Sequence, residues 1–216
     1  MTTPSGRALR DTVTRGFDLL ARRYDTPWIQ RSFYRPPQDA ILEELRVRGS
    51  RRIVDVGCGT GILADRIQRE LQPDEVLGVD RSTGMLSEAK ARSSTVRWIV
   101  APAEELPLPD DSVDAVTSTT AFHFFDQPVA LAEFRRVLTP GGIVALGTIT
   151  QPLPAPEPVR RIVRRWRIPA HHPSAAELRN LLTEAGFKVA EQRKVKSWAS
   201  RWLLFYRITV GLLRDS

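Results

Sequence analysis

The residues with the clearest chemical potential form a short pattern of acids and glycines. Asp55 lies near the end of a β-branched run and is followed by glycines at alternate positions, Gly57, Gly59 and Gly61. Alternating glycines let a backbone adopt unusual φ values and let a ligand approach the main chain closely. A second acid, Asp80, closes the next apolar run. A glycine turn flanked by two carboxylates indicates a small-molecule site against the backbone.

The spacing of the glycines excludes two common phosphate-binding patterns. The dinucleotide fingerprint needs a third glycine where this chain has Ile62, and a P-loop needs a Gly-Lys-Ser/Thr sequence that is absent. Asp55 at the mouth of the turn disfavours a second anion, and Asp80 has the position of an acid that binds a ribose diol. The site suits a nucleoside with a ribose, a cationic portion and no polyphosphate. S-adenosylmethionine meets that description, and its carboxylate can meet the N–H groups of the helix after Gly61.

Three histidines offer acid–base chemistry. His123 follows the fourth β-like run, and we expect it beside the reacting group as the candidate general base; the alternative is a ring packed among phenylalanines. His171 and His172 are candidates for the same pocket, and the alternative is an exposed loop pair. No further cluster has metal-site spacing, so we assign no metal ligand, and the sequence neither supports nor excludes a metal.

Alternating strands and helices must position these residues. Helical spacing also precedes them at residues 37–47, and a capping box of Ser174 and Glu177 begins a later helix that stops at Gly186. Such alternation predicts βαβ units with a parallel sheet and helices on both faces, closed by two antiparallel strands. The predicted strands are 52–56, 75–80, 96–100, 113–118, 143–149, 188–196 and 201–210, and the helices between them are 61–71, 82–92, 128–138 and 174–186.

The length of 216 residues predicts one domain. We divide it into an N-terminal helical cap (1–48), a cofactor-binding core (49–150) and an acceptor-side insert with closing strands (151–216). One cysteine, Cys58, excludes an intramolecular disulfide, and neither a signal-peptide pattern nor a spanning apolar stretch is found. We therefore expect a cytoplasmic protein that is a monomer or homodimer.

The charge is concentrated at one end of the sequence. Residues 151–216 hold thirteen Lys and Arg against five Asp and Glu, a net charge of +8. The whole chain has a net charge of +7, so the residues before 151 are close to neutral. This asymmetry indicates an anionic partner, or simply an arginine-rich composition. A nucleic-acid partner is one alternative, although no motif for flipped bases follows the fourth strand. Contact of residues 200–214 with a membrane surface is another, although this tract fits the last strand.

Five strings of the sequence, in order and at matching spacings, resemble class I S-adenosylmethionine-dependent methyltransferases of the "methyltransferase type 11" kind. They are VDVGCGTG, VLGVDRSTGML, APAEELPLPDDSVD, FHFFDQP and EFRRVLTPGG. The resemblance implies a Rossmann-like seven-stranded sheet of order 3-2-1-4-5-7-6 with the last strand antiparallel. It also implies methyl transfer to a small-molecule acceptor, which we expect at a hydroxyl of a sugar, polyketide, lipid or phenol. Quinone-type C-methylation and nucleic-acid methylation are the alternatives.

The resemblance also implies roles for single residues. The turn from Asp55 to Gly61 and Thr119 should hold the methionine part, Asp80 the ribose, and Tyr24 should close over the cofactor. Where the family often has an acid that accepts from the adenine amino group, this chain has Pro102. The cofactor-binding candidates are Tyr24, Asp55, Gly57, Cys58, Gly59, Gly61, Asp80, Arg81, Met85, Ala103, Glu104 and Thr119. The acceptor-binding candidates are Trp28, Tyr34, Arg35, His123, Trp166, His171 and His172.

Overall fold

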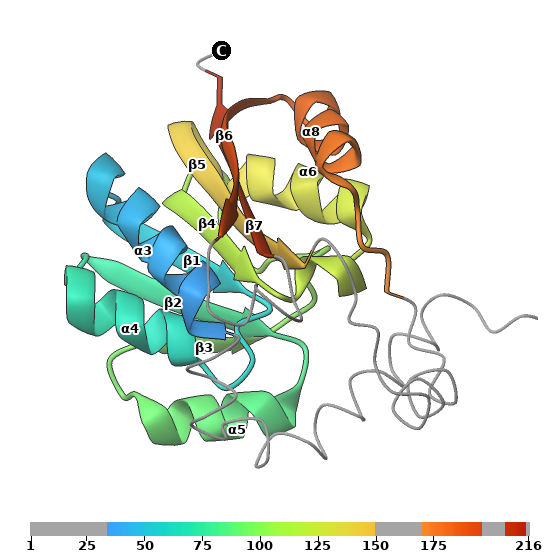
Figure 1. Ribbon diagram of the computed structural model, residues 1–216. Coiled ribbons are helices and arrows are strands. Elements are labelled where there is room, and N and C mark those ends of the chain that lie inside the picture. Colours follow the sequence, from blue (N-terminus) through green and yellow to red (C-terminus); the bar gives the residue numbers. More distant parts are fainter. Residues whose placement is uncertain (1–33, 150–169, 196–205, 215–216) are drawn as a thin grey trace, which may run out of the picture.

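A computed structural model describes residues 34–149, 170–195 and 206–214 of the chain. They form a seven-stranded sheet with helices packed on both faces (Figure 1). The strands are β1 (Arg52–Val56), β2 (Glu75–Asp80), β3 (Arg97–Val100), β4 (Val113–Thr119), β5 (Leu138–Ile149), β6 (Phe187–Val195) and β7 (Tyr206–Leu213). The helices are α3 (Arg35–Arg48), α4 (Ile62–Leu71), α5 (Thr83–Arg92), the 3-10 helix η2 (Phe122–Phe124), α6 (Gln127–Val137) and α8 (Ala175–Glu184).

The strand order is β3-β2-β1-β4-β5-β7-β6. Strands β1 to β5 pair in parallel, and β7 pairs antiparallel with both β5 and β6. The order and the antiparallel last strand confirm the predicted Rossmann-like fold class. Antiparallel insertion of β7 also brings its first residues to the edge where the parallel strands end, so that Tyr206 pairs with Ile149 and Arg207 pairs with Thr148.

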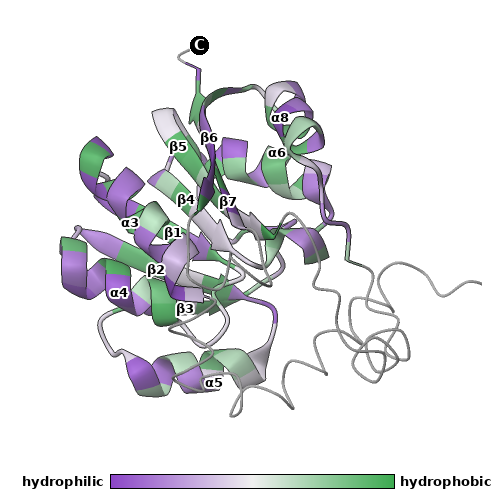
Figure 2. Ribbon diagram, viewed as in Figure 1, coloured by the Kyte–Doolittle hydropathy of each residue, from purple (hydrophilic) through white to green (hydrophobic). Residues whose placement is uncertain are grey.

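Two layers of helices bury the two faces of the sheet. Helices α3 and α4 cover a core that includes Ile53, while α6 and α8 cover the opposite core, which includes Val54 and Val56. Consecutive residues of β1 thus serve opposite faces, as the period of two in a strand requires. In Figure 2 each helix carries both hydrophobic and hydrophilic colouring, as expected of helices that pack one side on a sheet.

The predicted ends of the helices agree with the structure. Gly49 ends α3 in the left-handed region at φ 65°, and Ser82 caps α5 through its side chain. The capping box of Ser174 and Glu177 is complete at the start of α8. The predicted helical spacing before residue 24 and the proline-rich stretch after residue 150 lie outside the described residues.

Two strands differ from their predicted bounds. Strand β5 begins at Leu138, five positions before the predicted start at Ile143, because Leu138 pairs with Val113 of β4. Strand β7 extends to Leu213, beyond the predicted end at Val210, because its last residues pair with Lys188 and Phe187 at the start of β6. Both differences arise from pairing between distant segments.

The carboxyl ends of the parallel strands define the edge where ligands bind in open α/β sheets. The glycine turn follows β1, α5 begins just after β2, and η2 follows β4. The N-terminal end of α3 lies over the same edge, because a Cβ on Gly147 of β5 would be 3.4 Å from the Pro37 side chain. This edge holds most of the predicted site residues.

Candidate functional site

The glycine turn is held tightly against the ends of β2 and β4. The backbone N–H groups of Gly57 and Cys58 both donate to the Val79 carbonyl, at 2.8 and 3.1 Å. Gly57 has φ 70°, and a Cβ there would lie 2.5 Å from the Ala121 Cβ and 2.9 Å from the Phe125 ring. Both the backbone angle and the close neighbours therefore require glycine at this position.

A tryptophan fixes the other side of the turn. A Cβ on Gly61 would lie 2.4 Å from the Trp98 ring, and a Cβ on Gly78 would lie 2.3 Å from it. The Trp98 Nε1–H donates to the Ser93 carbonyl at 3.0 Å, and this hydrogen bond fixes the orientation of the indole ring. Sequence reasoning missed Trp98. The signal that could have found it is the glycine inside the second strand, since an isolated strand glycine often marks a close approach.

Gly59 differs from its two neighbouring glycines because it borders open space. It has φ 55°, and a Cβ built on it would meet no atom of the described residues within 4 Å. Its N–H donates to Asp80 Oδ2 at 2.8 Å, while Asp80 Oδ1 accepts from the Ser82 N–H at 2.8 Å. Asp80 thus ties the turn to the start of α5. A carboxylate oxygen can accept more than one hydrogen bond, so a carboxylate at this position is a suitable acceptor for a diol.

The first turn of α4 offers its N–H groups to a ligand. The N-terminal residue Gly61 is left-handed at φ 77°, and no side chain caps this end among the described residues. The first N–H groups of a helix have no partner within the helix, and its dipole favours an anion there. A ligand carboxylate placed over Gly59 would meet these groups.

Asp55 lies beneath the turn rather than at its mouth. Its side chain is only 1 % exposed, and its Oδ1 accepts a hydrogen bond from the Thr117 hydroxyl of β4 at 2.9 Å. Burial raises the pKa of Asp55 to about 7, the Thr117 hydrogen bond opposes this rise, and the charge of Asp80 adds to it. The carboxyl is therefore poised between its neutral and ionised forms, and it ionises more readily if a cation binds nearby.

Cys58 does not have the environment of a nucleophile. Burial, followed by the negative charges of Asp80 and Asp55, raises the pKa of the thiol well above its ordinary value. The thiolate is the reactive form of cysteine, so this thiol is unreactive near neutral pH. Its Sγ lies 3.2 Å from the position that a Cβ on Gly78 would take, which agrees with a requirement for a small side chain.

The candidates for the adenine side lie along α5 and the segment after β3. Met85 and Ala103 are 3 % and 5 % exposed, and Arg81 lies beside Asp80 at the end of β2. Glu104 is partly buried, and its Oε1 accepts from the Asp126 N–H at 2.7 Å. This bond joins the segment after β3 to the start of α6.

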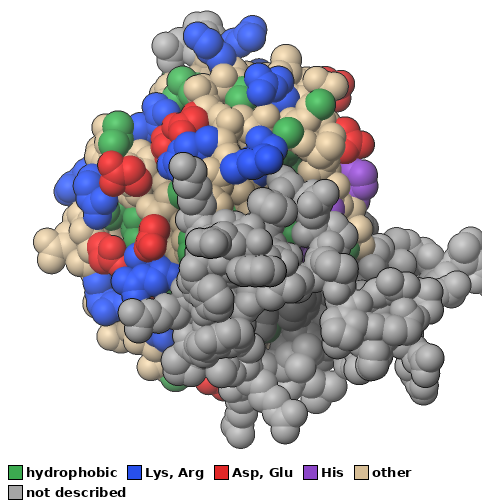
Figure 3. All heavy atoms as spheres, in the orientation of Figure 1, with side chains coloured by type: hydrophobic (Ala, Val, Ile, Leu, Met, Phe, Trp, Pro, Cys, Tyr) green, Lys and Arg blue, Asp and Glu red, His purple; other side chains and the backbone are tan. Residues whose placement is uncertain are grey.

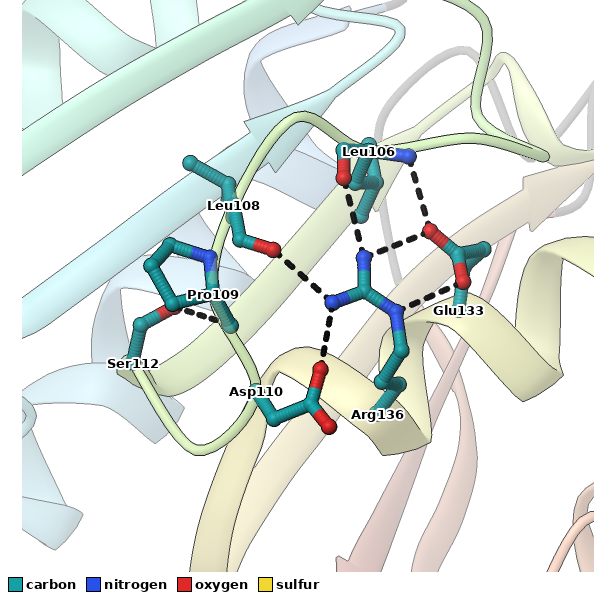
Figure 4. A network of polar contacts seen from close by, with 7 residues as sticks. All are labelled: Leu106, Leu108, Pro109, Asp110, Ser112, Glu133 and Arg136. Atoms are coloured by element: carbon teal, nitrogen blue, oxygen red, sulfur yellow. Dashed lines mark hydrogen bonds and ion pairs between the residues drawn. The ribbon is translucent and has the colours of Figure 1, made fainter.

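An arginine that sequence reasoning passed over holds the same segment in place (Figure 4). Arg136 of α6 donates to the backbone carbonyls of Leu106 and Leu108, at 2.9 and 2.8 Å. It also forms ion pairs with Asp110 and Glu133, each at 2.8 Å, and Glu133 in turn accepts from the Leu106 N–H. The family-like strings around residues 101–114 and 133–142 are thus joined physically.

The structure brings all three histidines to the end of β4 and β5. The His123 and His172 rings are stacked with centroids 4.3 Å apart, and the His123 carbonyl accepts from the His171 N–H at 2.9 Å. Gln127 Nε2 donates to the His171 carbonyl at 2.8 Å. Residues 170–174 are thereby docked on η2. His171 itself is exposed, and Figure 3 shows histidine side chains at the rim of the visible face.

His123 is a neutral imidazole in this setting. Its side chain is 8 % exposed, and burial lowers its pKa to about 3, with the neighbouring His172 adding to the shift. His123 also packs on Phe124, with ring centroids 3.9 Å apart, so the alternative of a ring packed among phenylalanines describes part of its environment. His172 is less buried, and burial lowers its pKa while a backbone hydrogen bond at Ile149 raises it.

The remaining candidates are placed in two ways. Tyr34 precedes α3 and interacts with the buried Tyr206 at the start of β7, whereas Arg35 is exposed and pairs with Asp39 at 3.8 Å. Thr119 ends β4 at the site edge. Tyr24, Trp28 and Trp166 lie outside the described residues.

The described residues show neither a helix suited to crossing a membrane nor a group of ligands suited to a metal ion. No helix in them is long and apolar enough to span a bilayer. No three of their His, Cys, Asp or Glu side chains are grouped to hold a metal.

Comparison with known proteins agrees with this geometry. Residues 54–146 match the family model described as a methyltransferase domain, of the type 11 methyltransferases. Residues 54–146 thus contain a methyltransferase domain of this family. The matched range runs from the glycine turn through β5, and so includes the turn, Asp80 and His123.

Two curated relatives and one solved structure show the extent of the similarity. A malonyl-[acyl-carrier protein] O-methyltransferase of Halorhodospira halophila is 34% identical over 164 residues, which cover 73% of this chain and 52% of the relative. An uncharacterized methyltransferase of Mycobacterium tuberculosis is 31% identical over 129 residues, covering 59% and 64%. A Haloferax volcanii methyltransferase, solved with the activator Trm112, has a TM-score of 0.74 and 23% identity, covering 92% and 98%. The chain thus spans about half to two thirds of the curated relatives it matches, and the solved structure supports the fold alone.

Proposed function

We propose that this methyltransferase domain binds S-adenosylmethionine over the glycine turn and directs its methyl group to an oxygen of a small-molecule acceptor. The observation that carries the proposal is the open space above Gly59, bordered by Asp80 and by the uncapped start of α4. The cofactor supplies a methyl group on a sulfonium, which is an electrophile that needs no metal activation.

The residues around the turn fit the parts of this cofactor. Asp80 accepts from the ribose hydroxyls, and the first turn of α4 receives the amino-acid carboxylate. Met85 and Ala103 offer buried apolar surface to the adenine. Asp55 and Asp80 provide negative potential that favours a cationic nucleoside, whereas a polyphosphate would be repelled.

Tyr24 and Thr119 complete the proposed cofactor set, with Arg81 and Glu104 bordering the adenine. These assignments rest on the family resemblance rather than on contacts. Glu104 accepts from the Asp126 N–H through Oε1, and its carboxylate is the acceptor that we propose for the adenine edge. Pro102 cannot supply the side-chain acceptor that the family often has there.

The histidine pair defines the proposed acceptor side. Because burial lowers the pKa of His123 to about 3, the ring is neutral at physiological pH and is a weak base. A weak base suffices for an oxygen that is already acidic, such as that of a phenol or carboxylic acid, but serves an aliphatic hydroxyl poorly. We therefore place His123 beside the reacting oxygen and favour the acidic end of the acceptors predicted from the sequence. The printed name of the Halorhodospira halophila relative, an O-methyltransferase, supports oxygen as the atom methylated.

Two alternatives and several wider assignments remain proposals. A quinone-type C-methyltransferase would use the same cofactor edge, and a nucleic-acid methyltransferase would need a basic surface beside it. On the visible face in Figure 3, basic side chains are interspersed with acidic ones, which supports a small-molecule acceptor over a nucleic acid. We retain cytoplasmic location, a monomer or homodimer, and Tyr34, Arg35, Trp28 and Trp166 at the acceptor as parts of the proposal.

The proposal is tested in two steps. Calorimetry with S-adenosylmethionine and S-adenosylhomocysteine measures cofactor binding. Incubation of the protein with methyl-labelled S-adenosylmethionine and a small-molecule fraction of cell extract, followed by mass spectrometry, then identifies the labelled product. We expect label on an oxygen of a small molecule. Label on carbon would support the quinone-type alternative, and label that appears only when nucleic acid is supplied would contradict the proposal.

A further inference from the structure

Four buried polar atoms around the end of β5 have no hydrogen-bond partner within the part of the chain that the structure describes. They are Ser118 Oγ, Thr148 Oγ1, His172 Nδ1 and Arg207 Nε. Each unmade hydrogen bond of this kind costs about 1–3 kcal/mol, and native proteins leave few such groups. Because these four atoms belong to residues at one edge of the sheet, they indicate a binding site for a polar group there.

The sheet register brings these atoms together. Thr148 of β5 and Arg207 of β7 are directly paired, and Ser118 lies on the other neighbour of β5, on the same α6/α8 face. His172 hydrogen-bonds to the backbone of Ile149, the residue after Thr148. The cluster therefore lies at the carboxyl edge of the sheet, and His172 joins it to His123 through the stacked rings.

The charge of the cluster indicates the sign of its occupant. Arg207 forms no ion pair among the described residues, and Lys194 of β6 stands directly opposite it. An anion on the α6/α8 face beside Arg207 would offset the guanidinium charge and accept a hydrogen bond from the buried Arg207 Nε–H.

We propose that this cluster, Ser118, Thr148, His172 and Arg207, binds a carboxylate group of the methyl acceptor. The inference deepens the proposed function and rests on it. Arg207 Nε–H and the hydroxyls of Thr148 and Ser118 donate to the two carboxylate oxygens, and bonds from a charged donor are about twice as strong as neutral ones. A group with one charge and two oxygens matches the single guanidinium of the partly buried Arg207, whereas a phosphate dianion would need a second cation.

His172 links this binding to a proton. Burial lowers the pKa of His172, and its bond at Ile149 opposes this shift, as donation to a carbonyl does, so in the neutral ring Nδ1 carries a lone pair. For Nδ1 to donate to a carboxylate, the ring must take up a proton. The titratable groups that act on it are His123, whose ring is stacked on it, and His171, whose charge lowers its pKa. A bound carboxylate supplies the missing counter-charge, so its affinity should fall as pH rises from 6 to 8.

The test uses propionate as the probe and propionamide as its uncharged counterpart. The chain has three histidines, so labelling with ¹⁵N-histidine gives few side-chain signals to follow by NMR. S-adenosylhomocysteine is present throughout, so that the start of α4 is not available to the probe. We expect that binding of propionate, at millimolar concentrations, causes one histidine to take up a proton from the solvent, and that this effect saturates. Propionate should bind more tightly at pH 6 than at pH 8, and propionamide should have no such effect. Equal binding of propionamide, or tighter binding of inorganic phosphate, would overturn the assignment.

Three variants locate the site. Arg207→Gln should weaken propionate binding by about tenfold or more, as expected for the loss of a charge-assisted bond. Lys188→Gln removes the same charge from an exposed position at the far end of β6 and should leave the affinity unchanged. Thr148→Val should weaken binding without loss of thermal stability, because the deleted hydroxyl has no partner. The Thr148→Val variant still tests the site if the Arg207→Gln protein does not fold. Equal effects of the Arg207 and Lys188 variants, or a Thr148→Val protein that binds normally but is less stable, would show ordinary structural roles.

Calorimetry with S-adenosylhomocysteine on the same samples separates the two proposals. If S-adenosylhomocysteine binds and propionate does not, only the carboxylate site is wrong. If S-adenosylhomocysteine does not bind, the cofactor assignment itself is wrong.

Discussion

Replacement of Asp55 by asparagine should make the protein more stable at alkaline pH. Asp55 is buried with a pKa of about 7, against an ordinary value of 3.8, and its main contact is the Thr117 hydroxyl. The folded protein therefore holds this proton over a range where the unfolded chain has lost it, and stability falls as pH rises from about 4 to about 7. An asparagine has the same shape, keeps an acceptor for Thr117, and carries no charge to bury.

The magnitude follows from the size of the shift. One pKa unit corresponds to 1.36 kcal/mol, so the interval from pH 5 to pH 7 is worth about 2.7 kcal/mol of unfolding free energy. Above the pKa of Asp55 in the folded protein, the loss of unfolding free energy no longer increases with pH. The stability difference between Asp55→Asn and the wild-type protein should thus increase by about 2–3 kcal/mol between pH 5 and pH 8. Other titrating groups are common to both proteins and cancel in the difference.

Urea unfolding at pH 5, 6, 7 and 8 measures this difference directly. Glu184→Gln, which neutralises an exposed acid on α8, is the matched control and should show no such trend. A constant difference across the pH range would refute the burial argument, and so would an Asp55→Asn protein that becomes less stable as pH rises. The same variant should lose more affinity for S-adenosylmethionine than for S-adenosylhomocysteine, since only the former is a sulfonium cation.

Three other substitutions test the frame around the site. Gly57→Ala should lower the free energy of unfolding, measured by calorimetry, by about 3 kcal/mol or more, because its Cβ would overlap Ala121 and Phe125. A variant that is as stable as the wild-type protein and binds the cofactor would contradict this. Arg136→Met should cost about 2–4 kcal/mol in urea unfolding, since it leaves two carbonyls and two carboxylates without their donor, and a neutral effect would show that the network of Figure 4 is dispensable. Ser174→Ala should cost about 1 kcal/mol through loss of the capping box, and no change on the same measurement would argue against it.

The fold could be predicted from the sequence because local signals agreed with one another. Buried strands alternate with capped helices, and the order of the family-like strings fixes the topology. The turn at Gly57, the cap at Ser82 and the stop at Gly49 are each set by a single residue with a local conformational preference. Strand bounds were less accurate at Leu138 and Leu213, where pairing with distant segments decides the end of the strand.

The site was predicted less completely because its contacts are long-range. The sequence put Asp55 at the mouth of the turn, but the inward direction of its side chain depends on Thr117 of another strand. His123 and His172 were selected separately, and only the docking of residues 170–174 on η2 stacks their rings. The sequence assigns no role to Arg207. Its pairing with Thr148 could not be predicted without the sheet register.

The central claim is that the turn above Gly59 selects an adenosyl sulfonium compound over phosphorylated nucleotides. Isothermal titration of the protein with S-adenosylmethionine, S-adenosylhomocysteine, NAD and ATP tests it most directly, with Asp80→Asn as the companion variant. The account predicts saturable heat for the first two ligands only, with at least about tenfold weaker binding after loss of the Asp80 charge. Binding of NAD or ATP at this site, together with no heat from either adenosyl compound, would contradict it.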